Sequence, residues 1–154
     1  MHLFEENIKN LGLNIPELPK ALANYVPYKI VGKTMYISGQ APVQNWELIY
    51  KGKVGSDITI EDGIEAARLC VTNIIAAVKT GLEDDWSKLD SFVKLTGFVN
   101  CQDDFTDQPK IINGASDMLV DIFGDQGRHA RVAVGSNALP LGIAVEIDAI
   151  VQLK

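Results

Sequence analysis

The sequence predicts an α+β domain in which a mixed β-sheet carries two helices packed on one face. Its 154 residues, 47% of them hydrophobic and 22% charged, fit one globular domain spanning residues 1–154. Two segments show helical periodicity and alternate with β-rich segments in the order ββ(β)αβαββ. A strand–helix–strand unit favours a parallel pair, whereas a hairpin makes an antiparallel one. The sheet should therefore be mixed, with both helices on the same side.

The first expected element is a short helix over residues 3–12. Apolar residues recur there at helical spacing until Gly12 ends the pattern. We assign this helix to a leader of residues 1–21, and we expect the core of the domain at residues 22–154.

The core should open with a β-hairpin. The segments 28–31 and 34–38 are rich in β-branched and aromatic residues, and only Gly32 and Lys33 separate them. Two residues suit a tight hairpin turn. The following stretch, residues 41–57, alternates weakly and is expected to form a loop with one short strand.

The longer main helix is expected at residues 59–80. Thr59 and Asp62 resemble a capping box, and Gly81 follows the last apolar position. Its apolar stripe consists of Ile60, Ile64, Ala67, Val71, Ile74, Ile75 and Val78. A β-rich strand is expected next, at residues 91–100.

The second main helix should begin near Thr106 and Asp107, just before Pro109, and end at Gly124. Its apolar stripe consists of Ile111, Ala115, Met118, Leu119 and Ile122. Two further strands are expected after this helix, at residues 130–135 and 142–153.

The alternation of the last strand indicates what lies on each face of the sheet. Val145, Ile147 and Val151 share one face, while Ile150 lies on the other together with Glu146. The second face is too apolar to lie comfortably in water, which favours oligomerisation through that face.

Composition limits the function classes. The net charge of −6 opposes attraction to phosphate, so nucleic acid is not an expected partner. Cys70 and Cys101 lie in unrelated segments, and His2 and His129 are too far apart for zinc, which predicts no disulfide and no metal. The start of the chain does not resemble a secretion signal, and no run approaches the ~18 apolar residues of a membrane helix. We therefore expect a soluble, cytoplasmic protein that does not insert into membranes.

The tail of the chain carries a specific spacing pattern. Ala130-Arg131 is followed by a short β run, and Leu139-Pro140 begins eight residues after the arginine. Val145-Glu146-Ile147-Asp148 follows, with Glu146 fifteen residues after the arginine.

Two upstream motifs accompany this pattern, Ser38-Gly39-Gln40-Ala41-Pro42 and the segment VKLTGFV at residues 93–99. Together with Asn73 and Asn113, these motifs resemble the RidA/YjgF family over about residues 22–153. The resemblance implies a chorismate-mutase-like fold, a homotrimer, and ligand sites in the clefts between subunits. It also implies hydrolysis of reactive 2-imino or 2-enamine acids to 2-keto acids and ammonia, without a cofactor.

Arg131 is the leading candidate for binding the carboxylate of a 2-imino or 2-keto acid, because its guanidinium group can grip a carboxylate through two hydrogen bonds. The resemblance implies that Glu146 holds the attacking water. An alternative is that the last two strands form a hairpin. Arg131 and Glu146 would then lie opposite each other and form a cross-strand ion pair.

The resemblance implies further ligand-binding residues. Tyr25 lies 13 residues before Ser38, which is the family's spacing between its site tyrosine and that serine, although both residues also suit plain turn and strand-end roles. Gly39 would let a main-chain N–H approach the ligand. Asn113 matches the family, and Ala133 stands where the family often has cysteine, so only its main-chain carbonyl could serve.

Departures from the family pattern mark a divergent subgroup. His129 stands where proline often precedes Ala-Arg, and the 41–57 and 82–90 segments are long. A competing function is a non-catalytic binder or regulator that senses small carboxylic acids in the same cleft. A third, endoribonuclease or translation inhibitor, is disfavoured by the acidic charge.

Overall fold

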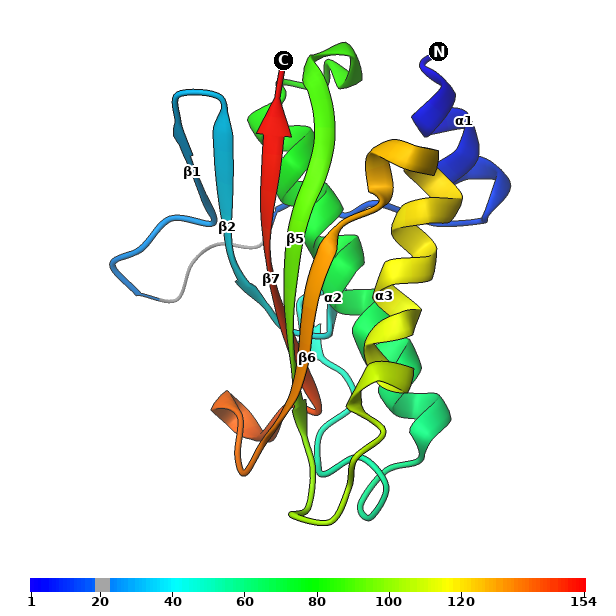
Figure 1. The fold of residues 1–154 in the computed structure, drawn as a ribbon, viewed down its shortest axis with the longest axis vertical. Helices are drawn as coiled ribbons and strands as arrows, with labels where there is room; N and C mark the ends of the chain where they lie inside the picture. Colours follow the sequence, from blue (N-terminus) through cyan, green and yellow to red (C-terminus); the bar gives the residue numbers. More distant parts are fainter. Residues whose placement is uncertain (19–22) are drawn as a thin grey trace.

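The protein is built on a mixed five-stranded sheet with its helices on one side (Figure 1). The computed structural model describes residues 1–18 and 23–154. In spatial order the strands are β1 (Tyr28–Val31), β2 (Thr34–Gln40), β7 (Val145–Leu153), β5 (Leu89–Asn100) and β6 (Ala130–Ser136). The expected mixed sheet is confirmed, because β5 and β6 are parallel and all other neighbours are antiparallel.

The arrangement of the last three strands differs from a hairpin. β6 and β7 do not pair with each other, because β5 lies between them and pairs with both. The crossover through the second main helix delivers β6 to the sheet edge, parallel to β5. The chain then returns on the other side of β5, where β7 pairs with both β5 and β2. The hairpin alternative is therefore wrong, and the central position of β7 satisfies both of its backbone edges.

The expected positions of the two main helices are confirmed. α2 spans Ile60–Gly81, and the Thr59 side chain accepts a hydrogen bond of 3.1 Å from the backbone N–H of Asp62. α3 spans Gln108–Phe123, has Pro109 in its first turn and ends at Gly124. Both lie on the same face of the sheet and pack against each other (Figure 1).

A third helix, α1 (Leu3–Asn10), packs on the outer side of α3. The Asn7 side-chain amide donates to the carbonyl of Ile122 at 2.7 Å. Phe4 also stacks edge-on against Phe123, with ring centroids 4.9 Å apart. The leader helix is thus fixed to the core, whereas the expected boundary at residues 21 and 22 lies outside the described residues.

The 41–57 segment contains two short strands rather than the expected one. β3 (Val43–Gln44) and β4 (Glu47–Leu48) form a hairpin of their own. Its two turn residues, Asn45 and Trp46, both have positive φ, as this tight turn type requires. The buried Asn73 on α2 donates to the carbonyls of Ala41 and Val43 and so anchors this segment.

The two faces of the sheet differ in cover. Along β7, Val145 and Ile147 are buried beneath the helices, whereas Glu146 and Asp148 point to the opposite face. No helix in the described part of the chain covers that opposite face (Figure 1). Its exposed apolar side chains are those of Val31, Tyr36, Val132 and Val134.

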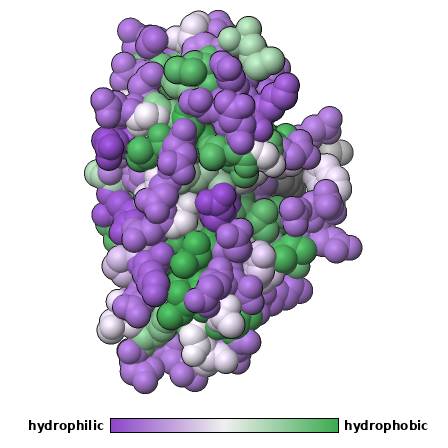
Figure 2. Space-filling model, turned by 90° about the vertical axis from the view of Figure 1, so that its right-hand side faces the viewer, coloured by the Kyte–Doolittle hydropathy of each residue, from purple (hydrophilic) through white to green (hydrophobic). Residues whose placement is uncertain are grey.

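The side of the molecule that carries α1 and α3 shows apolar areas separated by polar side chains (Figure 2). Among the described residues, no helix has the length and apolar character needed to cross a membrane.

Candidate functional site

Arg131 points from β6 towards the helices. It pairs in register with Leu95, whose side chain is fully buried in the core, so both side chains lie on the helix-covered face. Its Nη1 donates to Asn113 Oδ1 at 2.8 Å and to Ser116 Oγ at 3.2 Å, both on α3. These two bonds use both hydrogens of Nη1. The Nε and Nη2 edge of the guanidinium group makes no hydrogen bond to the described residues, and this is the edge that can grip a carboxylate.

Glu146 points to the uncovered face from β7. It pairs with Phe98 of β5 and is half-buried. Burial raises the pKa of the Glu146 carboxyl, and the charge of Asp148 raises it further. Burial also raises the pKa of Asp148, which a hydrogen bond from Thr96 partly opposes. A carboxylate with a raised pKa is a better base for a bound water than an ordinary one.

Gly39 lies directly against Glu146. The pairing of β2 with β7 is irregular between Ile37 and Gln40, so the strand bulges at this point. A Cβ atom added to Gly39 would lie 3.0 Å from Cδ of Glu146. Because Gly39 has no side chain, the carboxyl group of Glu146 can lie directly against its backbone.

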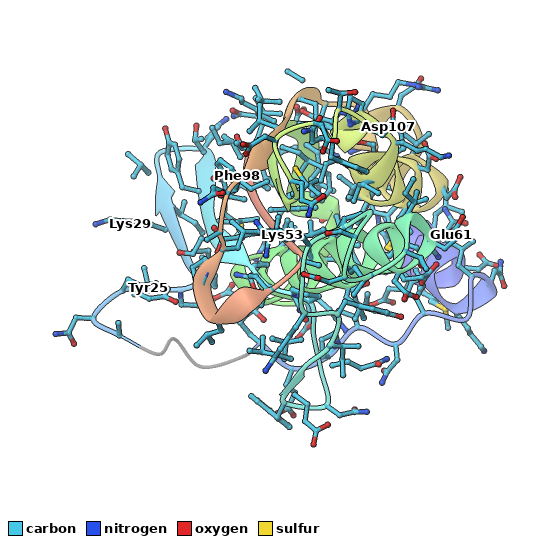
Figure 3. All side chains as sticks on the ribbon, turned by 90° about the horizontal axis from the view of Figure 1, so that it is seen from below. Tyr25, Lys29, Lys53, Glu61, Phe98 and Asp107 are labelled. Atoms are coloured by element: carbon cyan, nitrogen blue, oxygen red, sulfur yellow. The ribbon has the colours of Figure 1, made fainter. Side chains whose placement is uncertain are left out.

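Ser38 and Tyr25 belong to the same half of the molecule. The Ser38 hydroxyl donates to the carbonyl of Val26 at 2.6 Å, which ties the segment before β1 to β2. Tyr25 is 54% exposed on that segment and lies far from Asp107 at the start of α3 (Figure 3). The structure thus brings Gly39 to Glu146, ties Ser38 to the segment before β1, and leaves Tyr25 exposed to solvent.

The candidate residues form two groups on opposite faces of the sheet. Arg131, Asn113 and Ala133 lie on the helix-covered side near the β6 edge. Glu146 and Gly39 lie on the uncovered side. The alternative of a cross-strand ion pair between Arg131 and Glu146 is therefore wrong, because β5 separates their strands and their side chains point in opposite directions.

Sequence reasoning missed Ser116, which lies beside Asn113 on α3. Its hydroxyl lies 2.8 Å from Nε2 of His129, and Nδ1 of His129 lies 2.7 Å from the carbonyl of Gly127. The i, i+3 spacing from Asn113 was the available signal, since residues three apart share a helix face.

Lys53 was also missed. Its Nζ donates to Oδ1 of Asn100 at 3.0 Å and to the carbonyls of Cys101 and Asn137. Lys53 lies beside the η3 turn (Pro140–Gly142) at the end of the sheet (Figure 3). These neutral acceptors indicate a structural tie that holds the ends of β5 and β6 together.

Two further features bear on the chemistry. Within residues 1–18 and 23–154, no three side chains of His, Cys, Asp or Glu are grouped in a way that could hold a metal ion. Cys70 and Cys101 are both buried free thiols. Burial, and then the charge of Glu146, raises the pKa of Cys70 well above its usual range, so this thiol stays protonated.

Comparison with known proteins places the chain in a defined group. Residues 5–152 match the model of a family described as YjgF/chorismate mutase-like, putative endoribonuclease. A crystal structure of a protein of unknown function from Agrobacterium tumefaciens is 42% identical, with a TM-score of 0.93 over 99% of this chain and 93% of that one. A putative endoribonuclease from Shewanella oneidensis is 35% identical, with a TM-score of 0.94 over 99% of this chain and all of that one. A putative regulator, AldR, of Lactococcus lactis is 29% identical over 90% of this chain and 94% of its own.

Proposed function

Because the chain belongs to the YjgF/chorismate mutase-like family, that is, to the Rid proteins, we propose that it hydrolyses reactive 2-imino acids and their enamine tautomers. The products are a 2-keto acid and ammonia. The observation that carries the proposal is the guanidinium group of Arg131, which the described residues hold through Nη1, so that its Nε and Nη2 edge can grip a carboxylate.

The chemistry needs a fixed carboxylate, a water and a polarised imine. Glu146 takes a proton from the water as the water oxygen bonds to the imine carbon, and the C=N double bond becomes a single bond. That proton then passes to the nitrogen, which gives an amino alcohol. The hydroxyl hydrogen is transferred to the amino group, again through Glu146, as the C–N bond breaks, so that the carbonyl forms and ammonia leaves. Arg131 holds the substrate carboxylate throughout, which fixes the imine carbon against the water.

A complete site needs two copies of the chain. Arg131 and Glu146 lie on opposite faces of one sheet, so a ligand held by one cannot reach the other within a single chain. We propose a homotrimer in which the Arg131 side of one copy meets the Glu146 side of the next. The apolar side chains of the uncovered face and the free outer edge of β6 support this assembly.

A second candidate function is a binder or regulator that senses small carboxylic acids without turnover. The name of the Lactococcus lactis relative favours it, because that protein is described as a regulator. Ribonuclease activity, suggested by the name of the Shewanella oneidensis relative, is disfavoured by this chain's net charge of −6.

One experiment separates these functions. The decay of 2-iminopropanoate is measured with and without the protein, alongside calorimetric binding of 2-oxobutanoate and incubation with single-stranded RNA. Faster imine decay together with binding supports the deaminase. Binding without faster decay supports the sensor. Loss of RNA without either result would overturn both.

A further inference from the structure

Ser116 and His129 form a hydrogen-bonded chain that ends on Arg131. The order runs from the Gly127 carbonyl to Nδ1 of His129 at 2.7 Å, from Nε2 of His129 to Oγ of Ser116 at 2.8 Å, and from Ser116 to Nη1 of Arg131 at 3.2 Å. Three elements contribute, namely the η2 turn (Gly124–Gly127), α3 and β6. All three side chains are partly buried.

The direction of every bond follows from the partners at the two ends. A carbonyl can only accept, so Nδ1 of His129 carries the hydrogen. In neutral histidine the other nitrogen then accepts, so the Ser116 hydroxyl donates to Nε2. The Ser116 oxygen is left with its lone pairs for the N–H of Arg131. Each of the three hydrogen bonds thus has a single direction, running from Arg131 to Ser116, from Ser116 to His129 and from His129 to Gly127.

We propose that Ser116 and His129 are positioning residues that fix the guanidinium group of Arg131 with its Nε and Nη2 edge turned towards the ligand. An arginine side chain has many rotamers. If it is not held in place beforehand, ordering it on ligand binding costs conformational entropy, and the affinity for the ligand is lower. Asn113 and Ser116 together take both hydrogens of Nη1, which sets the plane of the group. This inference rests on the proposed role of Arg131 in binding carboxylates.

The electrostatics favour the neutral form of His129 in this hydrogen-bonded chain. Burial lowers the pKa of His129, and the charge of Arg131 lowers it further, while the bond to Gly127 partly opposes both. The charge that acts on His129 is that of Arg131 on β6. The hydrogen-bond partners of His129, Ser116 on α3 and the Gly127 carbonyl of η2, are neutral. The neutral form is the one that lets Nε2 accept from Ser116.

The test compares Ser116→Ala and His129→Phe with the conservative Ser116→Thr. We expect the dissociation constant for 2-oxobutanoate to rise about tenfold in the first two, the loss expected for one hydrogen bond to a charged group. Ser116→Thr should restore it to within about twofold, because threonine keeps the hydroxyl. Imine turnover should show the same change in KM with little change in kcat. Asp117→Ala, at an exposed neighbour on α3, is the matched control and should change nothing.

A second measurement does not depend on the ligand. In ¹⁵N-labelled protein, the bonds to Nη1 should slow rotation of the Arg131 guanidinium group and give separate Nη signals. Ser116→Ala should merge those signals, and Asp117→Ala should not. If wild-type protein binds no keto acid, the proposed function fails while the spectrum still decides the positioning role. Unchanged affinity and an unchanged spectrum in Ser116→Ala would overturn the inference.

Discussion

Arg131 and Glu146 lie on opposite faces of one sheet, on strands that are separated by β5. Their register partners on β5, Leu95 and Phe98, are three residues apart, and an odd separation along a strand puts side chains on opposite faces. Each residue has its own local support, Asn113 for the arginine and Gly39 for the glutamate. A reaction that needs both residues therefore needs two chains.

Arg131→Ala should remove ligand binding without unfolding the protein. The lost contact is a charge-assisted pair of hydrogen bonds, so the affinity for 2-oxobutanoate should fall by roughly 2–3 kcal/mol, measured by calorimetry. Arg128→Ala is the matched control, because that arginine is exposed and pairs with Asp125 on the surface. Equal loss in both variants would show that Arg131 contributes only general positive charge.

Mixed assemblies should recover activity that neither variant has alone. Arg131→Ala and Glu146→Gln chains are refolded together in equal amounts. If one chain supplies the arginine and the next the glutamate, about a quarter of the sites in randomly mixed trimers carry both intact residues. Imine hydrolysis should rise to that fraction of the wild-type rate. If each site lies within one chain, the mixture stays inactive.

Local sequence patterns predicted the helices and the strand positions well. The capping pair Thr59 and Asp62 marks the start of α2, and Gly124 follows the end of α3, because these signals act within one helical turn. The insertion of β5 between β6 and β7 could not be predicted in this way. It depends on the side of β5 on which β7 pairs. That side is set by backbone hydrogen bonds between segments that are far apart in the sequence.

The candidate site shows the same division. The motif spacing identified Arg131, Glu146 and Gly39 as residues, but the faces on which they lie follow from strand order. Ser116 and His129 could not be linked from the sequence because the contact joins α3 to the segment before β6, 13 residues apart along the chain.

Gly39→Ala should lower turnover more than stability. The added methyl group would lie 3.0 Å from Cδ of Glu146, so the carboxylate must move by a few tenths of an ångström. Geometric precision matters at the reacting water, and we expect kcat to fall about tenfold while the melting temperature changes by less than about 3 °C. Gly32→Ala lies at a hairpin turn with open space around it but a φ of 61°, so it should lower stability through backbone strain while leaving kcat unchanged. A loss of kcat in both would point to a general effect of strand rigidity.

Glu146→Gln should reduce turnover about a hundredfold while ligand binding persists, because the amide cannot accept the proton from water. It should also raise the melting temperature slightly at pH 7. The pKa of Glu146 is raised in the folded state, so the folded protein holds its proton more tightly than the unfolded chain, and stability falls as the pH rises through this window. The gain should vanish at acid pH, where both states are protonated.

Asp148→Asn tests the same electrostatics from the neighbouring carboxylate. The charge of Asp148 raises the pKa of Glu146, so its removal should lower that pKa. Wild-type turnover should rise with pH as Glu146 ionises, and the variant's rising limb should lie at lower pH. The measurement is kcat against pH for both proteins. If the rise of kcat with pH is at the same pH in both proteins, the ionisation of Glu146 does not control turnover.

His129→Gln should make the protein less sensitive to mild acid. The pKa of His129 is lowered from 6.5 in the folded state, mainly by burial. The unfolded chain therefore binds more protons there, and wild-type stability falls as the pH drops below about 6.5. Because the side chain is only half-buried, we expect less than about 1 kcal/mol from this source. Melting temperatures of both proteins at pH 7.5 and pH 5.5 measure it, and their difference isolates His129 because all other titrating groups are shared. A wild-type protein that loses no more than the variant would show that His129 is free to take up a proton in the folded state, and the hydrogen-bonded chain to Ser116 would then not require its neutral form.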